Sequence, residues 1–554
     1  MTAATDIFAT LTGAGSPFEI GERDGLRQFV AAPSDLDVII EAARRFDGRT
    51  CVVDFDRAGT ERRMTFAQFF AWRDQLVPLL GVKRGDHVAI CMRNSAEWLV
   101  GFLAVMKAGG VAALVNSRGS GPELRAMVED VSPAVVLADR ERAHALREAG
   151  YAGRVLDLTQ PLDPAEIPAA AENAAGVAPA ASHDPCAILF TSGTTGRVKG
   201  AVLSHLNMIT SLMATQLSGM MVLHNMAAKM GVPVETILAN LPQQASLLVS
   251  PLFHVSGLIS GFLSPFLSGG KVVIMRRWDG EEAARLIQHE KVTMFAAVPT
   301  MLWDILHRAK VAPESLATLN NIGSGGQALP INLVEEVHAL CPQAQIGTGY
   351  GMTECSGAIC QAVGPDFMRR PAAAGKVLPL VDVRIEGPDG TVLPHGEAGE
   401  IVVRGAQIMK GYWNRPEETA AALGADGWLH TGDIGTLDDE GYVTIVDRKK
   451  DMVISGGENI YCAEVERVIC ELPGVLECAA FGLPDERMGE RLVAVLVAPG
   501  VTEEAVIEQV SNRLARYKAP TRVAFSTTGL PRNPIGKADK IALRKAWPEL
   551  SGEQ

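Results

Sequence analysis

Apolar and polar residues alternate between two periods over roughly residues 35–300. Over residues 64–80 the apolar positions recur at helical spacing: Phe66, Phe69, Phe70, Leu76, Val77 and Leu80. Continuous apolar runs at 87–92 and 111–115 predict short buried strands, and residues 97–107 between them predict another helix. This alternation of strand and helix predicts parallel sheets covered by helices, which is the α/β fold class.

The pattern changes at about residue 375. Short strand-like runs, separated by turns rich in Gly, Pro and Asp, occur at 381–385, 399–403 and 442–446. Runs of this length between such turns predict a small β-barrel or a twisted antiparallel sheet over about 375–446.

The last hundred or so residues predict a separate α+β unit. Its helices are expected at 463–472 and 503–515, and its strands at 478–481 and 492–497. A chain of 554 residues exceeds what one hydrophobic core usually serves, so at least two domains are expected. We predict a large N-terminal domain of stacked βα subdomains plus the small β-barrel, residues 1–449. A smaller α+β C-terminal domain, residues 450–554, follows it.

Composition narrows the class of ligand. Apolar residues make up 47% and charged residues 21% of the chain, which excludes a mostly disordered protein. With 51 Lys and Arg against 64 Asp and Glu, the formal charge is −13, so no broad positive field favours nucleic acid or anionic lipid. An anionic ligand must therefore be held by a local arrangement of cations and hydrogen-bond donors.

Nothing in the sequence predicts secretion or a metal cluster. The nine cysteines are odd in number and have no metal-ligand spacing, so a disulfide framework is not expected. The N-terminus lacks a basic start and a sustained apolar core, and the most apolar stretch, 250–270, is interrupted by prolines and a histidine. We expect a cytoplasmic protein with no transmembrane segment.

A predicted buried strand at 187–190 runs directly into a loop rich in Gly, Ser and Thr. Its glycines let the backbone approach an anion, its hydroxyls donate hydrogen bonds, and its lysine supplies a charge. The candidate phosphate-binding residues are Thr191, Ser192, Gly193, Thr194, Thr195, Gly196 and Lys199. The spacing differs from that of the P-loop of the nucleotide triphosphatases.

This loop resembles the phosphate loop of the adenylate-forming superfamily, which contains acyl-CoA synthetases, peptide-synthetase adenylation domains and beetle luciferases. Further segments match the superfamily in order: GSGG at 323–326, YGMTE at 350–354, WLHTGD at 428–433, DRKKD at 447–451 and PRNPIGK at 531–537. The resemblance covers about residues 40–545 and is to the acyl-CoA synthetase or fatty-acid–CoA ligase branch.

The resemblance implies a two-step reaction. A carboxylate and ATP give an acyl-adenylate and pyrophosphate, and a thiol then attacks the acyl carbon as AMP leaves. It implies that Tyr350 stacks on adenine, that Thr353 reaches the α-phosphate, and that Glu354 binds Mg²⁺. It also implies ribose contacts from Asp433 and Arg448. The other implied nucleotide-binding positions are Gly325, Gly326, Gln327, Gly351 and Met352.

The C-terminal domain is implied to be mobile. Lys537 is the implied catalytic cation, which bridges the acyl carboxylate and the α-phosphate. Lys450 corresponds to a hinge, about which rotation replaces the Lys537 loop with Ser455, Gly456 and Gly457. Two glycines there are expected to leave a passage for the pantetheine arm of CoA.

The acid itself is less closely defined. Where amino-acid-activating relatives place an aspartate after the aromatic residue, this chain has His254, so a substrate ammonium lacks its anionic partner. The resemblance to acyl- and aryl-CoA ligases implies that His254 lies near the substrate carboxylate, and a packed core histidine is the alternative. An apolar acyl pocket formed by Val255, Leu258 and Gly349 is expected. A methionine-rich stretch suits either an irregular apolar ligand or plain core: Met208, Met213, Met220, Met221, Met226 and Met230.

We expect a fatty or bulky alicyclic acid, with an aryl acid as the alternative, and free CoA as the thiol acceptor. There are three alternatives to this function. The enzyme could transfer the acyl group to a carrier-protein thiol, it could oxidise the adenylate as luciferases do, or the chain could be a regulatory nucleotide-binding protein without activity. The expected ligands are thus ATP, Mg²⁺, CoA and a small carboxylic acid. A homodimer is compatible with the resemblance.

Overall fold

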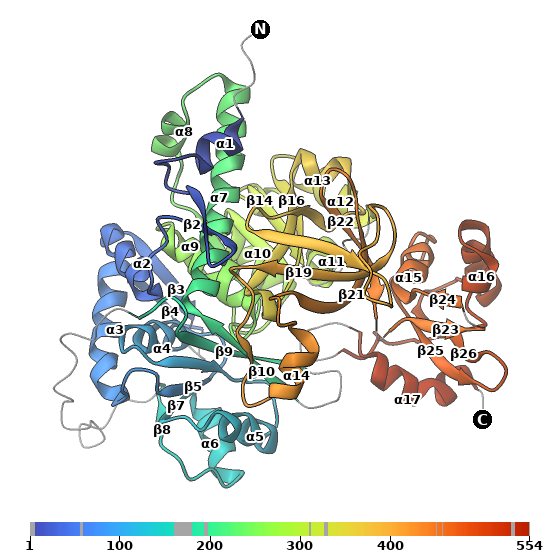
Figure 1. Ribbon diagram of the computed structural model, residues 1–554, viewed down its shortest axis with the longest axis horizontal. Helices are drawn as coiled ribbons and strands as arrows, with labels where there is room; N and C mark the ends of the chain where they lie inside the picture. The colour runs from blue at the N-terminus through green and yellow to red at the C-terminus, as the bar shows by residue number, and fades with distance from the viewer. Residues whose placement is uncertain are drawn as a thin grey trace.

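The computed structural model describes residues 6–552 of the chain except 56–58, 160–179, 193–197, 308, 310–311, 326–328, 330, 450, 457 and 533–537. Two large sheets lie side by side in the N-terminal part, and a smaller sheet forms the C-terminal part, at the right of Figure 1.

The first sheet has seven strands in the order β20-β10-β9-β6-β5-β7-β8. Its parallel strands are β5 (His87–Cys91), β6 (Val111–Leu114), β7 (Val135–Ala138), β8 (Val155–Asp157) and β9 (Pro185–Ser192), followed by the antiparallel β10 (Val198–Ser204) and β20 (Gly411–Tyr412). Strand β5 reads as a continuous apolar run because both of its faces are buried. Val88 and Ile90 pack towards α4 (Ala96–Lys107), and Ala89 and Cys91 pack towards α5 and α6.

Helices cover both faces of this sheet. On one side lie α3 (Phe66–Leu80) and α4, and on the other lie α5 (Gly121–Val131) and α6 (Arg140–Glu148), as Figure 1 shows. The predicted strand–helix alternation is therefore confirmed in this region, with the helix at 64–80 beginning at Phe66, directly after strand β4.

The second sheet has thirteen strands in the order β18-β19-β21-β22-β17-β16-β15-β14-β13-β11-β12-β3-β4. Its parallel half contains β3 (Thr50–Phe55), β11 (Ala245–Leu248), β12 (Lys271–Ile274), β13 (Met294–Ala297), β14 (Asn321–Gly325) and β15 (Gln345–Met352), with β4 (Glu61–Thr65) antiparallel at the edge. One face is covered by α10 (Gly280–His289), α11 (Pro299–His307) and α12 (Ile331–Leu340).

The strands predicted over about 375–446 continue this second sheet. They are β16 (Gly357–Val363), β17 (Gly375–Val377), β18 (Val381–Glu386), β19 (Gly399–Gly405), β21 (Leu429–Leu437) and β22 (Tyr442–Arg448). β17 pairs with both β16 and β22, which joins these antiparallel strands to the parallel half and leaves β18 at the edge of the strand order. The antiparallel character predicted for this region is confirmed.

The C-terminal part forms its own five-stranded sheet from residue 453 onwards. Its strands are β23 (Val453–Ser455), β24 (Glu458–Ile460), β25 (Glu477–Asp485), β26 (Gly489–Val497) and β27 (Arg522–Phe525). Helices α15 (Cys462–Cys470) and α16 (Glu503–Arg513) cover one face, and α17 (Lys540–Ser551) covers the other. The predicted α+β character of this part is confirmed, with longer strands than expected.

Helix α7 (His205–Met230) is unusually long, with 26 residues. It begins at a capping box between Ser204 and Asn207 and ends at Gly231, whose φ of 67° terminates it. Its first half is buried in the core, whereas its far end projects with α8 (Val234–Asn240) at the top of Figure 1. Within the described part of the chain it is the one helix long and apolar enough to cross a membrane, but 56% of its most apolar window is buried, as in a core helix of a soluble protein.

Buried charges join the two large sheets. The carboxylate of Asp54, at the end of β3, is fully buried and accepts hydrogen bonds from Arg62 at 2.6 Å and Arg276 at 2.9 Å. The same carboxylate accepts from the backbone N–H of Ala96, at the start of α4, at 3.1 Å. Arg62 also pairs with Glu97 of α4 at 2.6 Å, so this network fixes the second sheet against a helix of the first.

We expect Asp54→Asn to lower the free energy of unfolding by about 3 kcal/mol, because two arginines lose their buried anionic partner. Chemical unfolding followed by tryptophan fluorescence measures the change. The control is Asp382→Asn, whose partner Arg27 is half exposed, and which should change stability by less than about 1 kcal/mol. Equal effects of the two substitutions would contradict a joining role for Asp54.

Candidate active site

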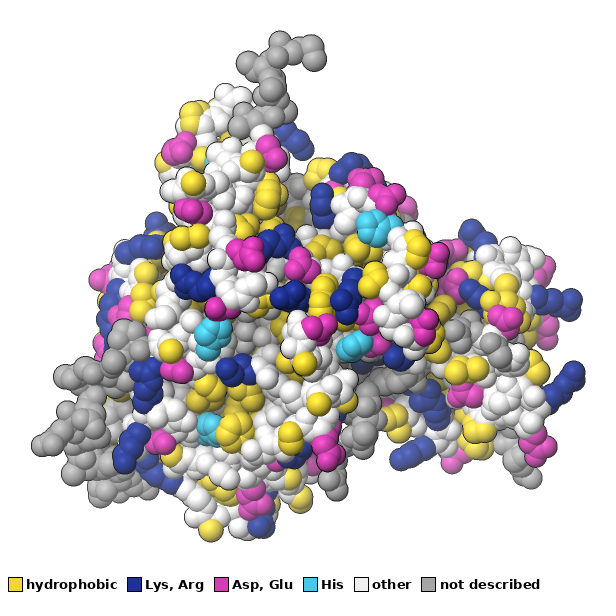
Figure 2. Space-filling model, in the orientation of Figure 1, with side chains coloured by type: hydrophobic (Ala, Val, Ile, Leu, Met, Phe, Trp, Pro, Cys, Tyr) yellow, Lys and Arg dark blue, Asp and Glu magenta, His cyan; other side chains and the backbone are white. Residues whose placement is uncertain are grey.

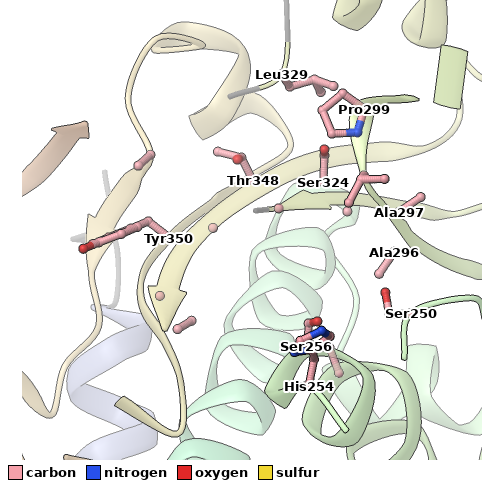
Figure 3. Close-up of a pocket in the computed structure, with 18 of the residues that line it drawn as sticks. Ser250, His254, Ser256, Ala296, Ala297, Pro299, Ser324, Leu329, Thr348 and Tyr350 are labelled. Carbon is pink, nitrogen blue, oxygen red and sulfur yellow. The ribbon is translucent and has the colours of Figure 1, made fainter. Parts of the chain in front are cut away.

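One continuous cleft of about 4470 Å³ receives the ends of strands from both large sheets and also borders the C-terminal domain. Figure 3 shows part of its wall, with His254 and Ser256 on one side and Ser324, Thr348 and Tyr350 on the strands opposite. The cleft brings together most of the predicted site residues that the structure describes: Thr191, Lys199, His254, Val255, Gly325, Gly349, Tyr350, Gly351, Met352, Thr353, Glu354, Asp433 and Arg448.

Strands β9 and β10 hold the two ends of the predicted phosphate loop next to each other. Thr191 and Lys199 are partners in the antiparallel register, and the Thr191 hydroxyl donates to the Lys199 carbonyl at 3.4 Å. The backbone of Ser192 ends β9. The centre of the predicted loop, formed by Gly193, Thr194, Thr195 and Gly196, lies outside the described residues.

Glu354 presents a buried carboxylate to the cleft. It lies in a tight turn directly after β15, with only 6% of its surface exposed, and its Oε1 accepts a hydrogen bond from the Tyr412 hydroxyl at 2.8 Å. Burial raises the pKa of Glu354 above its usual value, and the Tyr412 hydroxyl partly offsets this by stabilising the charged form. A carboxylate oxygen beside the phosphate loop is the kind of ligand Mg²⁺ takes, so the residues present fit that ion.

Tyr412 was not singled out in the sequence, yet it contacts two of the predicted groups. Besides its bond to Glu354, its ring lies 5.1 Å from the ammonium of Lys199, which is within the range of a cation–π interaction. Strand β20 places it there by pairing with β10. The sequence signal was weak, because one tyrosine after a glycine is not a motif for any particular chemistry.

Tyr350, Asp433 and Arg448 form a second group. The Tyr350 hydroxyl donates to Asp433 Oδ2 at 2.7 Å, and the Arg448 guanidinium lies 3.3 Å from Asp433 Oδ1. Burial, followed by the negative charge of Asp433, raises the pKa of Tyr350 well above its usual value, so the hydroxyl stays protonated. A charged carboxylate so placed retains lone pairs that can accept from two neighbouring hydroxyls.

The glycines of the site differ in how much space a side chain would have at each position. A Cβ on Gly351 would lie 2.0 Å from the carbonyl oxygen of Gly357, so the pairing of β15 with β16 excludes any side chain there. A Cβ on Gly325 would meet nothing closer than 3.7 Å, and one on Gly349 nothing closer than 3.3 Å. Packing thus explains Gly351, whereas Gly325 leaves open space at the cleft. Gly326 and Gln327 lie outside the described residues.

His254 precedes a short π-helical segment, Ser256–Leu263. The side chain of Asn94 fixes the approach to it by donating to the Ser250 carbonyl at 2.8 Å and accepting from the Leu252 N–H at 3.0 Å. Such π-helical turns are frequent at functional sites.

Leu258 does not belong to the acyl pocket. Its side chain is fully buried in the hydrophobic core, whereas Val255 and Ile259 line the cleft. The wide π-helical turn changes which residues share a face, so the α-helical spacing that groups positions three and four apart does not hold here. Ile259 replaces Leu258 in the lining.

The C-terminal domain lines the far side of the cleft with α15, the start of α17 and the segment before it. At the junction, Asp447 Oδ2 accepts from the backbone N–H of Ala463, in the first turn of α15, at 3.3 Å. Burial raises the pKa of Asp447 to about 6. Ser455 and Gly456 lie on and beside β23, away from the cleft lining, and Lys450, Gly457 and Lys537 lie outside the described residues.

Comparison with known proteins gives consistent matches along the chain. The model of the AMP-binding enzyme family matches residues 39–413, and that of the AMP-binding enzyme C-terminal domain matches residues 464–537. The long-chain-fatty-acid–CoA ligase FadD13 of Mycobacterium tuberculosis is 35% identical over 497 residues, which are 88% of this chain and 94% of that protein.

A second relative is the 3-[(3aS,4S,7aS)-7a-methyl-1,5-dioxo-octahydro-1H-inden-4-yl]propanoyl:CoA ligase of Rhodococcus jostii, 35% identical over 533 residues, covering 91% of this chain and 97% of the relative. Among solved structures, ATP-bound MatB from Rhodopseudomonas palustris superposes with a TM-score of 0.78 at 29% identity, over 92% of this chain and 99% of MatB.

The bond between Tyr412 and Glu354 predicts a pH effect. Because the pKa of Glu354 is raised, the charged form that a cation would require is lost at a higher pH than for an ordinary glutamate as the pH falls. Tyr412→Phe removes a donor that stabilises the carboxylate, so the pKa rises further and the loss of MgATP affinity is expected to begin at a higher pH than in the wild-type protein. Isothermal titration calorimetry across a pH series measures this shift.

The matched control is Tyr442→Phe, which removes another tyrosine–carboxylate bond, to Asp366, outside the cleft lining. It should leave the pH dependence of MgATP binding unchanged. A Tyr412→Phe profile that overlays the wild-type profile would refute the link between this hydroxyl and the carboxylate.

Proposed function

This chain belongs to the AMP-binding enzyme family and is an ATP-dependent acyl-CoA ligase, and we propose that its substrate is a long or bulky, predominantly apolar carboxylic acid. The observation that carries this proposal is the continuation of the cleft along α7. One face of that helix lines it, through Ser211, Thr215, Gly219, Val222 and Met226.

The length of this wall supports an extended acid. Ser211 to Met226 covers about 22 Å of helix axis at 1.5 Å per residue, comparable with the length of a long-chain fatty acid. The residues change from small and polar near Ser211 to large and apolar near Met226, and Leu223, Leu238 and Leu241 line the same end. A carboxylate at the polar end and a hydrocarbon tail at the apolar end match this gradient.

The width of the cleft near His254 supports the proposal that the substrate acid can carry a bulky acyl group. The strands facing the π-helical segment contribute small side chains or none, at Ala296, Gly323 and Gly349, so the space between the layers is not filled by the protein (Figure 3). The two relatives named above act on a long-chain fatty acid and on a bicyclic propanoate, which differ in shape but share large apolar bodies.

In the first step, the acid carboxylate attacks the α-phosphorus of ATP and pyrophosphate leaves. Lys537 lies between the two anions and reduces their repulsion, while Thr191, Lys199 and the loop between them hold the β- and γ-phosphates. Tyr350 stacks on adenine, Asp433 and Arg448 hold the ribose, and Thr353 donates to the α-phosphate. Glu354 would hold Mg²⁺, which would neutralise charge on the phosphates when bound.

In the second step, the C-terminal domain rotates about Lys450 and brings Ser455, Gly456 and Gly457 to the cleft. The CoA sulfur attacks the acyl carbon, the bond from that carbon to the AMP oxygen breaks, and AMP leaves with the electron pair. His254 stays near the reacting carboxyl group throughout. We place this chemistry in the cytoplasm, and a homodimer remains a prediction.

The role proposed for Lys537 predicts that its substitution slows adenylation but not thioester formation. Lys537→Ala should slow adenylation by about two to three powers of ten, the scale for one transition-state donor. ATP–pyrophosphate exchange measures the first step, and CoA-dependent release of AMP from synthetic acyl-adenylate measures the second, which should be spared. Lys545→Ala, an exposed lysine of the same domain, is the control. Equal loss in both assays would disprove the assignment.

The part of the cleft lined by α7 predicts that a substitution at its far end affects activity on long acids more than on short ones. Met226→Trp fills the far end of the cleft, so kcat/KM should fall about tenfold for a C16 acid, because overpacking costs roughly one to three kcal/mol, and stay unchanged for a C6 acid. Met230→Trp is the control, since Met230 is 63% exposed and does not line the cleft. Coupled assays of AMP release over a graded series of acids measure the effect. Uniform loss across chain lengths would rule out this route for the acyl chain.

A further inference from the structure

A closed ring of hydrogen bonds lies behind the predicted ribose-binding pair. The backbone N–H of Gly432 donates to Glu400 Oε1 at 3.1 Å, and the backbone N–H of Lys449 donates to the Gly432 carbonyl at 2.9 Å. The Lys449 ammonium closes the ring by donating to Glu400 Oε2 at 2.9 Å. Glu400, on β19, therefore binds Gly432 of β21 and Lys449, the residue that directly follows β22.

The ring holds an irregular part of the sheet. In the pairing of β19 with β21, Glu400 is opposite Ile434 and Val402 is opposite His430, so the single residue Ile401 faces three residues, 431–433. This bulge leaves Thr431, Gly432 and Asp433 without regular partners on β19, although Asp433 remains paired with Arg448 of β22. Bulges of this kind re-aim side chains next to active sites. The extra residues need other partners for their backbone, and Glu400 supplies one of them.

Two members of the ring, Gly432 and Lys449, are each adjacent in sequence to a residue of the predicted ribose pair. Asp433 follows Gly432, and Arg448 precedes Lys449, so fixing the two ring residues fixes the backbone from which both ribose-binding side chains extend. Lys449 is also the last described residue before the predicted hinge at 450. The ring thus joins the nucleotide site to the fixed end of the hinge.

We propose that Glu400 is a positioning residue for the ligase reaction: its carboxylate bridges Gly432 and Lys449 and so holds Asp433 and Arg448 at the spacing that the two ribose hydroxyls require. The proposal rests on the assignment of Asp433 to ribose made above. Glu400 is at the edge of the cleft lining, and in this proposal it acts on the ribose through its neighbours. His430, with Nδ1 3.4 Å from Glu400 Oε2, adds a further contact to the same carboxylate.

The carboxylate is well suited to this role. Only 9% of Glu400 is exposed, so it is held away from competing water. Burial raises the pKa of Glu400, but the ion pair with Lys449 outweighs it and keeps the pKa below the ordinary value, so the group is charged at neutral pH. Glutamine has the same shape but faces Lys449 without a negative charge.

The test compares ATP with 2′,3′-dideoxy-ATP, which lacks both hydroxyls, in ATP–pyrophosphate exchange. We expect the wild-type protein to prefer ATP by at least about tenfold in kcat/KM, since each hydrogen bond to a charged group is worth roughly that factor. In Glu400→Gln the preference should shrink to within about twofold, with kcat/KM for dideoxy-ATP unchanged. Lys449→Met is a second variant with the same expected direction.

Glu397→Gln, an exposed residue of the turn before β19, is the matched control and should keep the full preference. Two outcomes overturn the inference: a Glu400→Gln protein with wild-type preference for ATP, or one in which both nucleotides lose activity by the same factor. A wild-type protein without any preference for ATP would instead refute the assignment of Asp433 to ribose, which separates the failure of that assignment from the failure of this one.

Discussion

The reaction requires two anions, a carboxylate and a triphosphate, to meet inside a protein that is itself strongly negative. With a net charge of −13, the protein as a whole does not attract either ligand, and Figure 2 shows acidic and basic side chains interspersed over the visible surface. The interactions that attract the two anionic ligands must therefore come from side chains and backbone groups close to the site. The two sheets supply them by ending at one cleft, so that Lys199, Arg448 and the polar ends of several strands face the same space.

The sequence predicted the site residues that belong to short motifs, but not those whose role depends on strand pairing. Tyr350, Glu354 and Asp433 belong to short runs whose order matched a known superfamily, and they lie together in the cleft although 83 residues separate Tyr350 from Asp433. The family, the fold class and the activity predicted from those runs are confirmed. Tyr412 and Glu400 were missed because their importance comes from strand pairing and a bulge, which no local spacing reveals.

The partners of a strand and the exposed face of a turn were harder to predict. The pattern over 375–446 described antiparallel strands correctly, but it did not show that the three-residue strand β17 joins them to the parallel half of the second sheet. Leu258 was expected in the acyl pocket with Val255, but the π-helical turn there buries Leu258 and turns Ile259 to the cleft. Local patterns fix the type of an element better than its partners or the residues that it exposes.

The end of β22 connects the main body, the nucleotide site and the C-terminal domain through three consecutive residues. Three consecutive side chains have three different partners: Asp447 binds the start of α15 in the C-terminal domain, Arg448 binds Asp433 in the nucleotide site, and Lys449 binds Glu400 behind it. The rotation about residue 450 proposed above would change the first of these contacts but not the other two, because Asp433 and Glu400 belong to the same sheet as β22. The nucleotide can therefore stay bound while the tail changes position, which a two-step reaction with an enzyme-held adenylate requires.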